Sequence, residues 1–121
     1  MDIAEVERIR AAAARFGERF IGRIYTPAEV AYVERRGRAS RYQRYAARFA
    51  AKEAGMKAIG TGWRRGVRWR DFEVTNLASG RPTLRLSGAA AEFAAQLGVR
   101  NIALSLTHTA TEAMAYVILE S

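Results

Sequence analysis

The 121-residue sequence suits one compact domain, and its 20 Lys and Arg residues exceed its 12 Asp and Glu residues, which gives a net charge of +8. This charge favours an anionic partner, such as nucleic acid, a phosphorylated small molecule or an acidic protein. The lack of cysteine excludes disulfides and thiolate metal sites, and the lack of a long apolar run excludes a membrane span, so we expect a cytoplasmic protein with no membrane partner.

The first part of the chain predicts two basic helical segments. Apolar residues recur at helical spacing from Ile3 onward, so residues from about Ala4 to Ala14 are predicted to form an amphipathic helix. Gly17 weakens this helix. A second, shorter apolar segment consists of Phe16, Phe20, Ile21 and Ile24. Five arginines make the region basic, and a solvated polar face is their commoner role: Arg8, Arg10, Arg15, Arg19 and Arg23.

Thr26, Pro27 and Glu29 indicate the start of another helix. Threonine can cap a helix, and proline fits the first helical position. A glutamate three residues after the cap can complete a capping box. This helix is expected to end near Arg36 and Gly37, and a short connector leads from there to the next helix.

The longest helix is predicted between Ser40 and Gly62. Good helix formers fill this stretch, a serine at its start can act as the N-cap, and glycines at its end would terminate it. Glu53 and Lys57 lie four residues apart and would share one face of the helix. Arg48 lies about one and a half turns before Glu53.

After this helix, residues 63–70 contain four arginines and two tryptophans. Interleaved basic and aromatic residues can stack on bases and neutralise phosphates, so a basic RNA-binding module is the alternative function. The run is short and has no RNA-binding signature around it. A solvated loop with one or two buried tryptophans is the commoner outcome.

The C-terminal half predicts two hairpins with a helix between them. Phe72–Thr75 and Thr83–Leu86 are predicted to pair as strands, and residues 87–98 to form a helix that Ser87 caps. Asn101–Thr107 and Ala113–Leu119 are predicted to form the second hairpin. Helices followed by hairpins predict a single α+β domain, with helices packed on an antiparallel sheet.

Few residues suggest chemistry on their own. His108, at the end of a predicted strand, could bind a phosphate, although the local sequence favours a histidine hydrogen-bonded at a hairpin turn. Asp2 and Glu53 lie among small or apolar residues, and oxygen-only ligands suit Mg²⁺. The alternative for Glu53 is an exposed ion pair with Lys57, which the spacing alone favours. The backbone of residues 60–62 could approach a phosphate, but no P-loop signature is present.

Several fragments occur together in a characteristic order: DIAEVERI at 2–9, ARFAAKEAGMKAIGTG at 47–62, WRDFEVTN, SGRPTLRLSG, AAQLGV, SLTHT and AMAYVILE. In this order they resemble the holo-acyl-carrier-protein synthases, the short phosphopantetheinyl transferases, and the resemblance covers nearly the whole chain. The 47–62 run is similar to the signature helix of that family. A short apolar strand usually precedes the aspartate motif, whereas Met1 directly precedes Asp2 here. A chain without that strand would leave Asp2 on a frayed terminus.

The resemblance implies Mg²⁺-dependent transfer of 4′-phosphopantetheine from coenzyme A to a serine of apo-acyl carrier protein, which releases adenosine 3′,5′-bisphosphate and serves fatty acid biosynthesis. By motif position, Asp2 and Glu53 would hold Mg²⁺, Glu53 and Lys57 would be catalytic, and Lys57 would face the transferred phosphoryl group.

The resemblance also implies a binding site for coenzyme A and a docking site for the carrier protein. Its coenzyme A contacts would be Arg48, Lys57, Gly60, Thr61, Gly62 and His108. Because acyl carrier proteins are acidic, Arg8 on the first helix becomes a docking residue. Family members form trimers with active sites at subunit interfaces, so we expect a homotrimer, and nucleic acid is not an expected partner.

Overall fold

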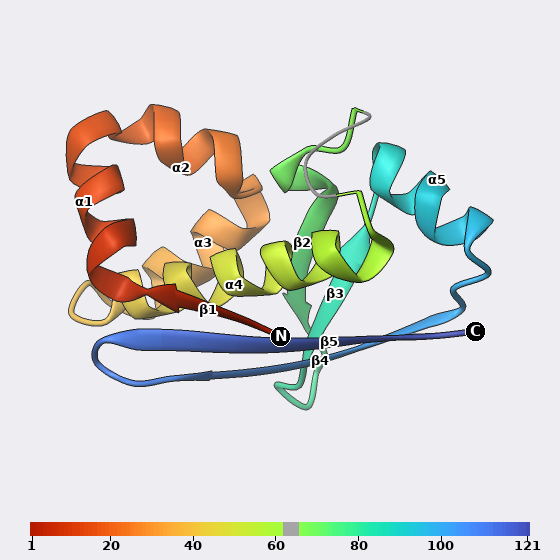
Figure 1. Ribbon diagram of the computed structural model, residues 1–121. Helices are drawn as coiled ribbons and strands as arrows, with labels where there is room; N and C mark the ends of the chain where they lie inside the picture. Colours follow the sequence, from red (N-terminus) through yellow and green to blue (C-terminus); the bar gives the residue numbers. More distant parts are fainter. Residues whose placement is uncertain (62–65) are drawn as a thin grey trace.

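The computed structural model in Figure 1 describes residues 1–61 and 66–121. The helices are α1 (Val6–Phe16), α2 (Glu18–Ile24), α3 (Pro27–Arg35), α4 (Arg41–Ile59), α5 (Gly88–Gln96) and a short 3-10 helix, η1 (Trp69–Asp71). The strands are β1 (Asp2–Glu5), β2 (Phe72–Asn76), β3 (Pro82–Leu86), β4 (Asn101–His108) and β5 (Glu112–Glu120). In these residues, no helix has the length and apolar character needed to cross a membrane.

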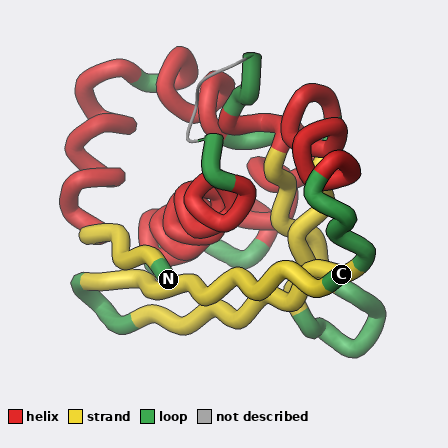
Figure 2. The backbone as a smooth tube through the Cα atoms, turned by 45° about the vertical axis from the view of Figure 1, so that its right-hand side comes forward, coloured by secondary structure: helices red, strands yellow, loops and turns green. Residues whose placement is uncertain are grey.

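The strands form two antiparallel sheets. One sheet has the order β1-β5-β4, and the other is the β2–β3 hairpin. Helix α4 lies along one face of the larger sheet. Helices α1, α2 and α3 form a helical layer beside the N-terminal half of α4 (Figure 1; Figure 2). The fold is therefore α+β, as the sequence predicted.

Helix α4 packs against both sheets, and alanine is the commonest residue at its buried positions. Ala46, Ala50 and Ala54 recur every four residues, and each is at most 3% exposed. Small side chains let a helix approach a sheet closely. At Gly55 the approach is so close that an added Cβ would lie 2.8 Å from Cδ1 of Phe72 in β2. This packing fixes the position of α4 between the two sheets.

The N-terminal prediction was partly wrong. Residues Asp2–Glu5 form β1, which pairs with β5 from Asp2 opposite Ala115 to Glu5 opposite Glu112, and the helix begins at Val6 rather than Ala4. Helical periodicity continues into this strand, but pairing with β5 determines its conformation. The frayed terminus is not observed, because Asp2 is a paired and buried residue.

The capping predictions had mixed outcomes. The capping box of α3 is present, with Thr26 Oγ1 accepting from the Glu29 amide and the Glu29 carboxylate accepting from the Thr26 amide. Ser40 and Ser87 precede α4 and α5, but neither makes a side-chain cap hydrogen bond. The hydroxyl of Ser40 instead accepts a hydrogen bond from Arg44.

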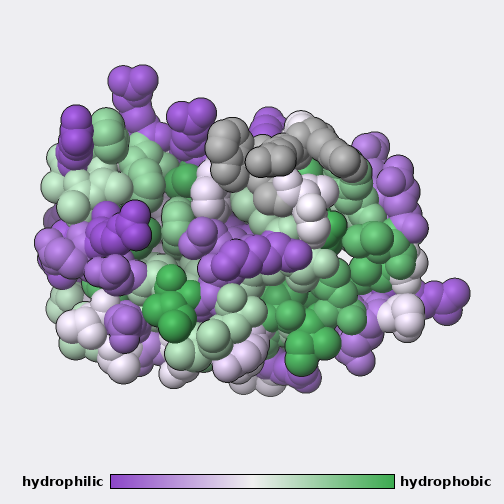
Figure 3. Space-filling model, in the orientation of Figure 1, coloured by the Kyte–Doolittle hydropathy of each residue, from purple (hydrophilic) through white to green (hydrophobic). Residues whose placement is uncertain are grey.

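The outer face of the larger sheet carries exposed apolar side chains. Tyr116 and Ile118 of β5 and Ile3 of β1 are each about half exposed, at 50%, 59% and 47%. Ile3 lies opposite Met114, so all three point away from α4. Figure 3 shows apolar surface gathered where β5 runs, whereas the surface over α1 mixes hydrophilic and weakly apolar side chains.

Candidate functional site

Asp2 and Lys57 join β1 to the last turns of α4. Oδ1 of Asp2 lies 2.9 Å from Nζ of Lys57, and the Asp2 side chain is only 8% exposed. Its second oxygen, Oδ2, is buried and has no hydrogen-bond partner among the described residues. A buried carboxylate oxygen without a donor is costly, so Asp2 is incompletely satisfied by this chain alone.

Glu53 lies one turn before Lys57 on α4 and is half-buried. Burial raises its pKa, the negative charge of Asp2 raises it further, and the positive charges of Lys57 and Arg8 oppose this shift. The fold therefore brings together Asp2, Glu53, Lys57 and Arg8. The ion pair that spacing favoured, Glu53 with Lys57, is replaced by Lys57 with Asp2, because β1 brings a second carboxylate within reach.

A cleft of about 310 Å³ adjoins these charges. Glu53 and Phe49 of α4 form one side, and Arg8 of α1, residues of β1 and Phe20 of α2 form the others. Arg8 is exposed, so a charged partner can reach it from solvent. The cleft therefore places the carboxylate of Glu53 and the guanidinium of Arg8 beside an apolar wall.

The donor set fits Mg²⁺. Two carboxylates, Asp2 and Glu53, come from different elements and interact electrostatically, and one oxygen of Asp2 lacks a donor. The described residues contain no group of three or more Asp, Glu, His or Cys that could enclose a metal. Mg²⁺ commonly takes one or two carboxylates and completes its shell with water and phosphate oxygens. Such a site needs no third protein ligand.

Arg48 lies on another face of α4, away from the Asp2–Lys57 pair. It is 4% exposed, its guanidinium stacks 4.3 Å from the centroid of the Tyr32 ring, and one of its amino groups lies 3.5 Å from Oδ1 of Asn76. Burial lowers its pKa, while the charge of Glu29 opposes this shift. Its Nε has no hydrogen-bond partner among the described residues. The single chain thus buries Arg48 between α3 and β2.

Residues 60–62 begin where α4 ends. Gly60 adopts a left-handed conformation with φ 80°, and its amide bonds back to the carbonyls of Met56 and Lys57. Thr61 is buried. Gly62 lies outside the described residues.

His108 is the last residue of β4 and is exposed. It pairs across the ladder with Ala113 of β5, and Ala113 pairs in turn with Ala4 of β1. Within the described part of the chain, no hydrogen bond or ion pair connects His108 to Asp2, Glu53 or Lys57. The predicted site residues that the structure describes therefore do not all gather at one place in the chain.

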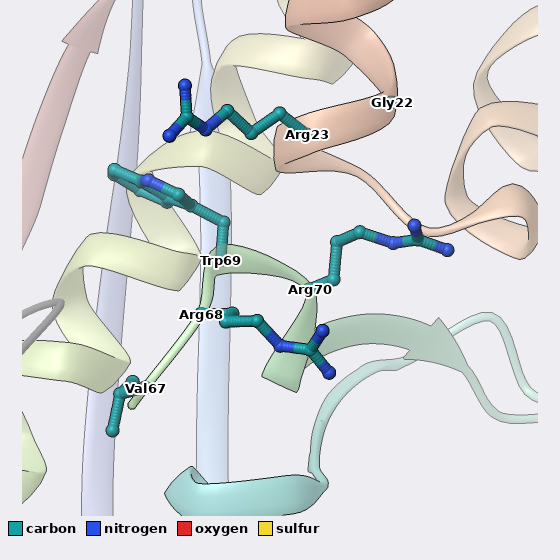
Figure 4. Close-up of a pocket in the computed structure, with 6 residues that line it drawn as sticks. All are labelled: Gly22, Arg23, Val67, Arg68, Trp69 and Arg70. Atoms are coloured by element: carbon teal, nitrogen blue, oxygen red, sulfur yellow. The ribbon is translucent and has the colours of Figure 1, made fainter. Parts of the chain in front are cut away.

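A second cavity, of about 630 Å³, lies between α2 and η1 and is lined by Gly22, Arg23 and residues 67–70 (Figure 4). Arg23 extends above the Trp69 ring, whereas Arg68 and Arg70 point away from it. The Trp69 ring stacks on Phe49 with centroids 4.8 Å apart. Trp69 is partly buried and packs against the core, and the side chains of Arg23, Arg68 and Arg70 do not converge on one point. Trp63, Arg64 and Arg65, the rest of the proposed RNA-binding loop, lie outside the described residues.

Sequence reasoning missed the ion pair between Glu29 and Lys52. Both side chains are fully buried and form an ion pair of 2.6 Å between Oε1 and Nζ. The available signal was Lys52 itself, a lysine among the alanines that face the core. Its partner lies 23 residues away and could not be identified by helical spacing.

Comparisons with known proteins agree with this architecture. The chain is 66% identical over 121 residues to a holo-[acyl-carrier-protein] synthase of Solibacter usitatus, covering 100% of this chain and 95% of the relative. It is similar to the crystal structure of holo-[acyl-carrier-protein] synthase from Neisseria meningitidis, with a TM-score of 0.88, 32% identity and coverage of 99% and 94% of the two chains. A Bacillus anthracis holo-(acyl-carrier-protein) synthase in complex with CoA (3′,5′-ADP) matches with a TM-score of 0.80, 34% identity and coverage of 99% and 92%. Residues 1–117 match the family model described as the 4′-phosphopantetheinyl transferase superfamily, and the chain belongs to that family.

Proposed function

We propose that this enzyme transfers 4′-phosphopantetheine from coenzyme A to a serine of apo-acyl carrier protein, and that the reaction takes place beside Asp2, Glu53 and Lys57. The observation that carries the site assignment is the buried Oδ2 of Asp2, which has no donor in the described structure and lies near Glu53. The family membership and the relatives that are named holo-acyl-carrier-protein synthases support the reaction.

Asp2 and Glu53 would hold Mg²⁺, which would supply positive charge to neutralise the phosphates of coenzyme A. Asp2 is held by the ladder to β5 and by Lys57, so its carboxylate is oriented before the substrate arrives. The Lys57 side chain is 68% exposed, and its ammonium is available to neutralise charge on the phosphoryl group that is transferred. Positioning and electrostatic stabilisation are the main contributions a protein makes to phosphoryl transfer.

The other predicted contacts fit a site that a second copy of the chain completes. Arg48, His108 and residues 60–62 are proposed to bind coenzyme A, yet Arg48 and His108 lie apart from Glu53 in one chain. The exposed outer face of the larger sheet, with Ile3, Tyr116 and Ile118, supports a homotrimer with active sites between chains. The proposed setting is fatty acid biosynthesis in the cytoplasm.

Arg8 is the proposed docking residue for the carrier protein. It is exposed on α1 and lies at the cleft that also contains Glu53. Opposite charges on two partners speed their encounter and fix their orientation. An acidic carrier protein that contacts Arg8 would present its serine to this cleft.

The test is the mass of apo-acyl carrier protein after incubation with coenzyme A, Mg²⁺ and this enzyme. The expected result is a gain of one phosphopantetheine group, which Glu53→Gln abolishes and the exposed-surface control Glu92→Gln preserves. An unchanged carrier mass, with an active transferase run in parallel, would contradict the proposal.

The metal assignment has its own test in the absence of coenzyme A. A ligand at a hundred times its Kd stabilises a folded protein by about 2.7 kcal/mol. Mg²⁺ should therefore raise the melting temperature of the wild type and of Glu112→Gln, a control in the same sheet, but not that of Asp2→Asn. An equal rise in all three proteins would show that Mg²⁺ binds elsewhere.

A further inference from the structure

Lys52 and Glu29 form a buried ion pair that the proposed chemistry does not use. Both side chains are 0% exposed, and Nζ of Lys52 lies 2.6 Å from Oε1 of Glu29. Lys52 is the residue directly before Glu53 on α4, and Glu29 lies in the first turn of α3. The pair therefore connects the helix that carries the proposed site to a helix outside it.

The ammonium of Lys52 also binds the backbone next to β2. Nζ donates to the carbonyl of Trp69 at 3.3 Å and to the carbonyl of Phe72. An ammonium group has three protons, so these two carbonyls and Glu29 satisfy it completely. Lys52 thereby ties α4 to both ends of η1 and to the start of β2.

The carboxylate of Glu29 is shared in the same way. Oε1 also accepts from the amide of Thr26 at 3.0 Å, and Oε2 accepts from the amide of Val74 at 2.9 Å. One carboxylate thus fixes the start of α3, the middle of β2 and, through Lys52, the middle of α4.

The bonds of this network indicate a role in positioning α4 rather than a role in stabilising the fold. Taking two charges out of water costs about as much as their attraction returns, so a buried pair is weak grounds for stability. Burial lowers the pKa of Lys52, and the charge and hydrogen bond of Glu29 oppose that shift. What the network provides is a set of directional bonds from α4 to α3, η1 and β2.

Those bonds control the direction in which Glu53 points. Successive residues on a helix are rotated by about 100°, so Lys52 facing α3 and β2 turns Glu53 toward β1, where Asp2 lies. A rotation or axial shift of α4 would move Glu53 and Lys57 together relative to Asp2. We propose that Glu29 and Lys52 are positioning residues, which hold α4 so that Glu53 and Lys57 face Asp2. This inference rests on the function proposed above.

The main test is Glu29→Asp, which keeps both charges but shortens the carboxylate side chain by one methylene. The control is Glu34→Asp, because Glu34 also joins α3 to α4, through Tyr45 at 2.7 Å and Arg41 at 3.5 Å, but near the start of α4. Loss of a group that hydrogen-bonds a metal ligand typically lowers metal affinity or activity by roughly 10–100-fold, and this range is the upper bound for residues that act on the ligands through a helix. We expect Glu29→Asp to weaken Mg²⁺ binding and lower kcat within this bound, with KM for the carrier protein unchanged, and Glu34→Asp to match the wild type.

The double variant Glu29→Gln with Lys52→Met separates positioning from stability. Each single change leaves a buried charge unpaired and should lower the melting temperature, and the double change should recover part of that loss without restoring kcat. Calorimetry without coenzyme A measures the Mg²⁺ affinity of every variant that folds. Wild-type Mg²⁺ affinity and kcat in folded Glu29→Asp would overturn the inference. If the wild type binds Mg²⁺ but transfers nothing, the proposed function fails, and the affinity of Glu29→Asp still decides the positioning role.

Discussion

The ammonium of Lys57 lies 2.9 Å from Oδ1 of Asp2, although the two residues are 55 positions apart in the chain. This hydrogen bond raises the pKa of Lys57, and the charge of Asp2 raises it further, so the lysine is held in its charged form. It also leaves Oδ2 of Asp2 as the unpartnered oxygen. Lys57 therefore orients the carboxylate of Asp2 while its own side chain remains 68% exposed to solvent.

Replacing Lys57 by Met should lower kcat by about 10²–10³, the range seen when a preorganised electrostatic group is removed from an active site. The change removes the cation proposed to neutralise the transferred phosphoryl group. Lys57→Arg keeps the charge and is expected to retain more activity than Lys57→Met. Steady-state kinetics with apo-acyl carrier protein provide the measurement, and a kcat for Lys57→Met equal to that of the wild type would exclude the role.

The metal-free protein should lose stability as the pH rises through the titration of Glu53. Its pKa is raised above the ordinary value of 4.5, mainly by burial and secondly by the charge of Asp2. The folded state therefore keeps a proton on Glu53 at pH values where the unfolded state has already lost it. The free energy of unfolding therefore falls between pH 4.5 and the higher folded pKa. Removing this carboxylate with Glu53→Gln should flatten that part of the profile.

The measurement is urea unfolding at several pH values in the presence of a chelator. Glu92→Gln, on the surface of α5, is the control and should reproduce the wild-type slope in this pH window. At neutral pH, Glu53→Gln should be more stable than the wild type without metal and inactive with it. A wild-type slope in Glu53→Gln would show that other groups cause the pH dependence.

Gly55→Ala should destabilise the fold by about 1–3 kcal/mol, the usual cost of overpacking a core. The new Cβ would lie 2.8 Å from Cδ1 of Phe72 and 3.0 Å from Cδ2 of Leu84, and Phe72 is fully buried. Gly22 in α2 is the matched control, because an added Cβ there meets no atom within 4 Å. Gly22→Ala should be stabilising by about 0.4–1 kcal/mol. Denaturant unfolding of both variants measures the difference, and equal stabilities would contradict the close packing of α4 on β2.

Arg8→Glu should raise KM for the carrier protein by at least about tenfold, because placing like charges opposite each other costs several kcal/mol. The value of kcat should change less, since Arg8 is proposed to dock the partner rather than act on the phosphoryl group. Arg100→Glu makes the same change of charge next to the start of β4, remote from α1. If both variants raise KM equally, net charge rather than a docking site attracts the carrier protein.

Local sequence signals predicted the elements that local interactions determine. The capping box of Thr26 and Glu29 is complete, and α4 ends at the glycine that the pattern indicated. Strand β1 could not be predicted in this way, because four residues with apolar spacing also fit the start of a helix. Its conformation comes from pairing with β5, more than a hundred residues away.

The site could be predicted only as far as the family motifs reached. The motifs predicted Asp2, Glu53 and Lys57 as site residues, and the fold brings these three together, whereas spacing alone gave Lys57 the wrong ion-pair partner. Arg48 was predicted on the same helix, but spacing did not show that it faces Tyr32. The partner of Lys52 was missed because it lies on another helix, and only the packing of α3 against α4 brings the two charges into contact.

The pairing of β1 with β5 has a consequence for insertions and deletions. Asp2 lies opposite Ala115 on the face covered by α4, and Ile3 lies opposite Met114 on the bare face. Side chains alternate between the two faces of a strand, so a slip of one residue would turn the carboxylate outward and place Ile3 beneath the helix. A single residue gained or lost between Asp2 and α1 would therefore exchange the residue that faces α4 with the residue on the bare face, while every side chain of the proposed site remained in the sequence.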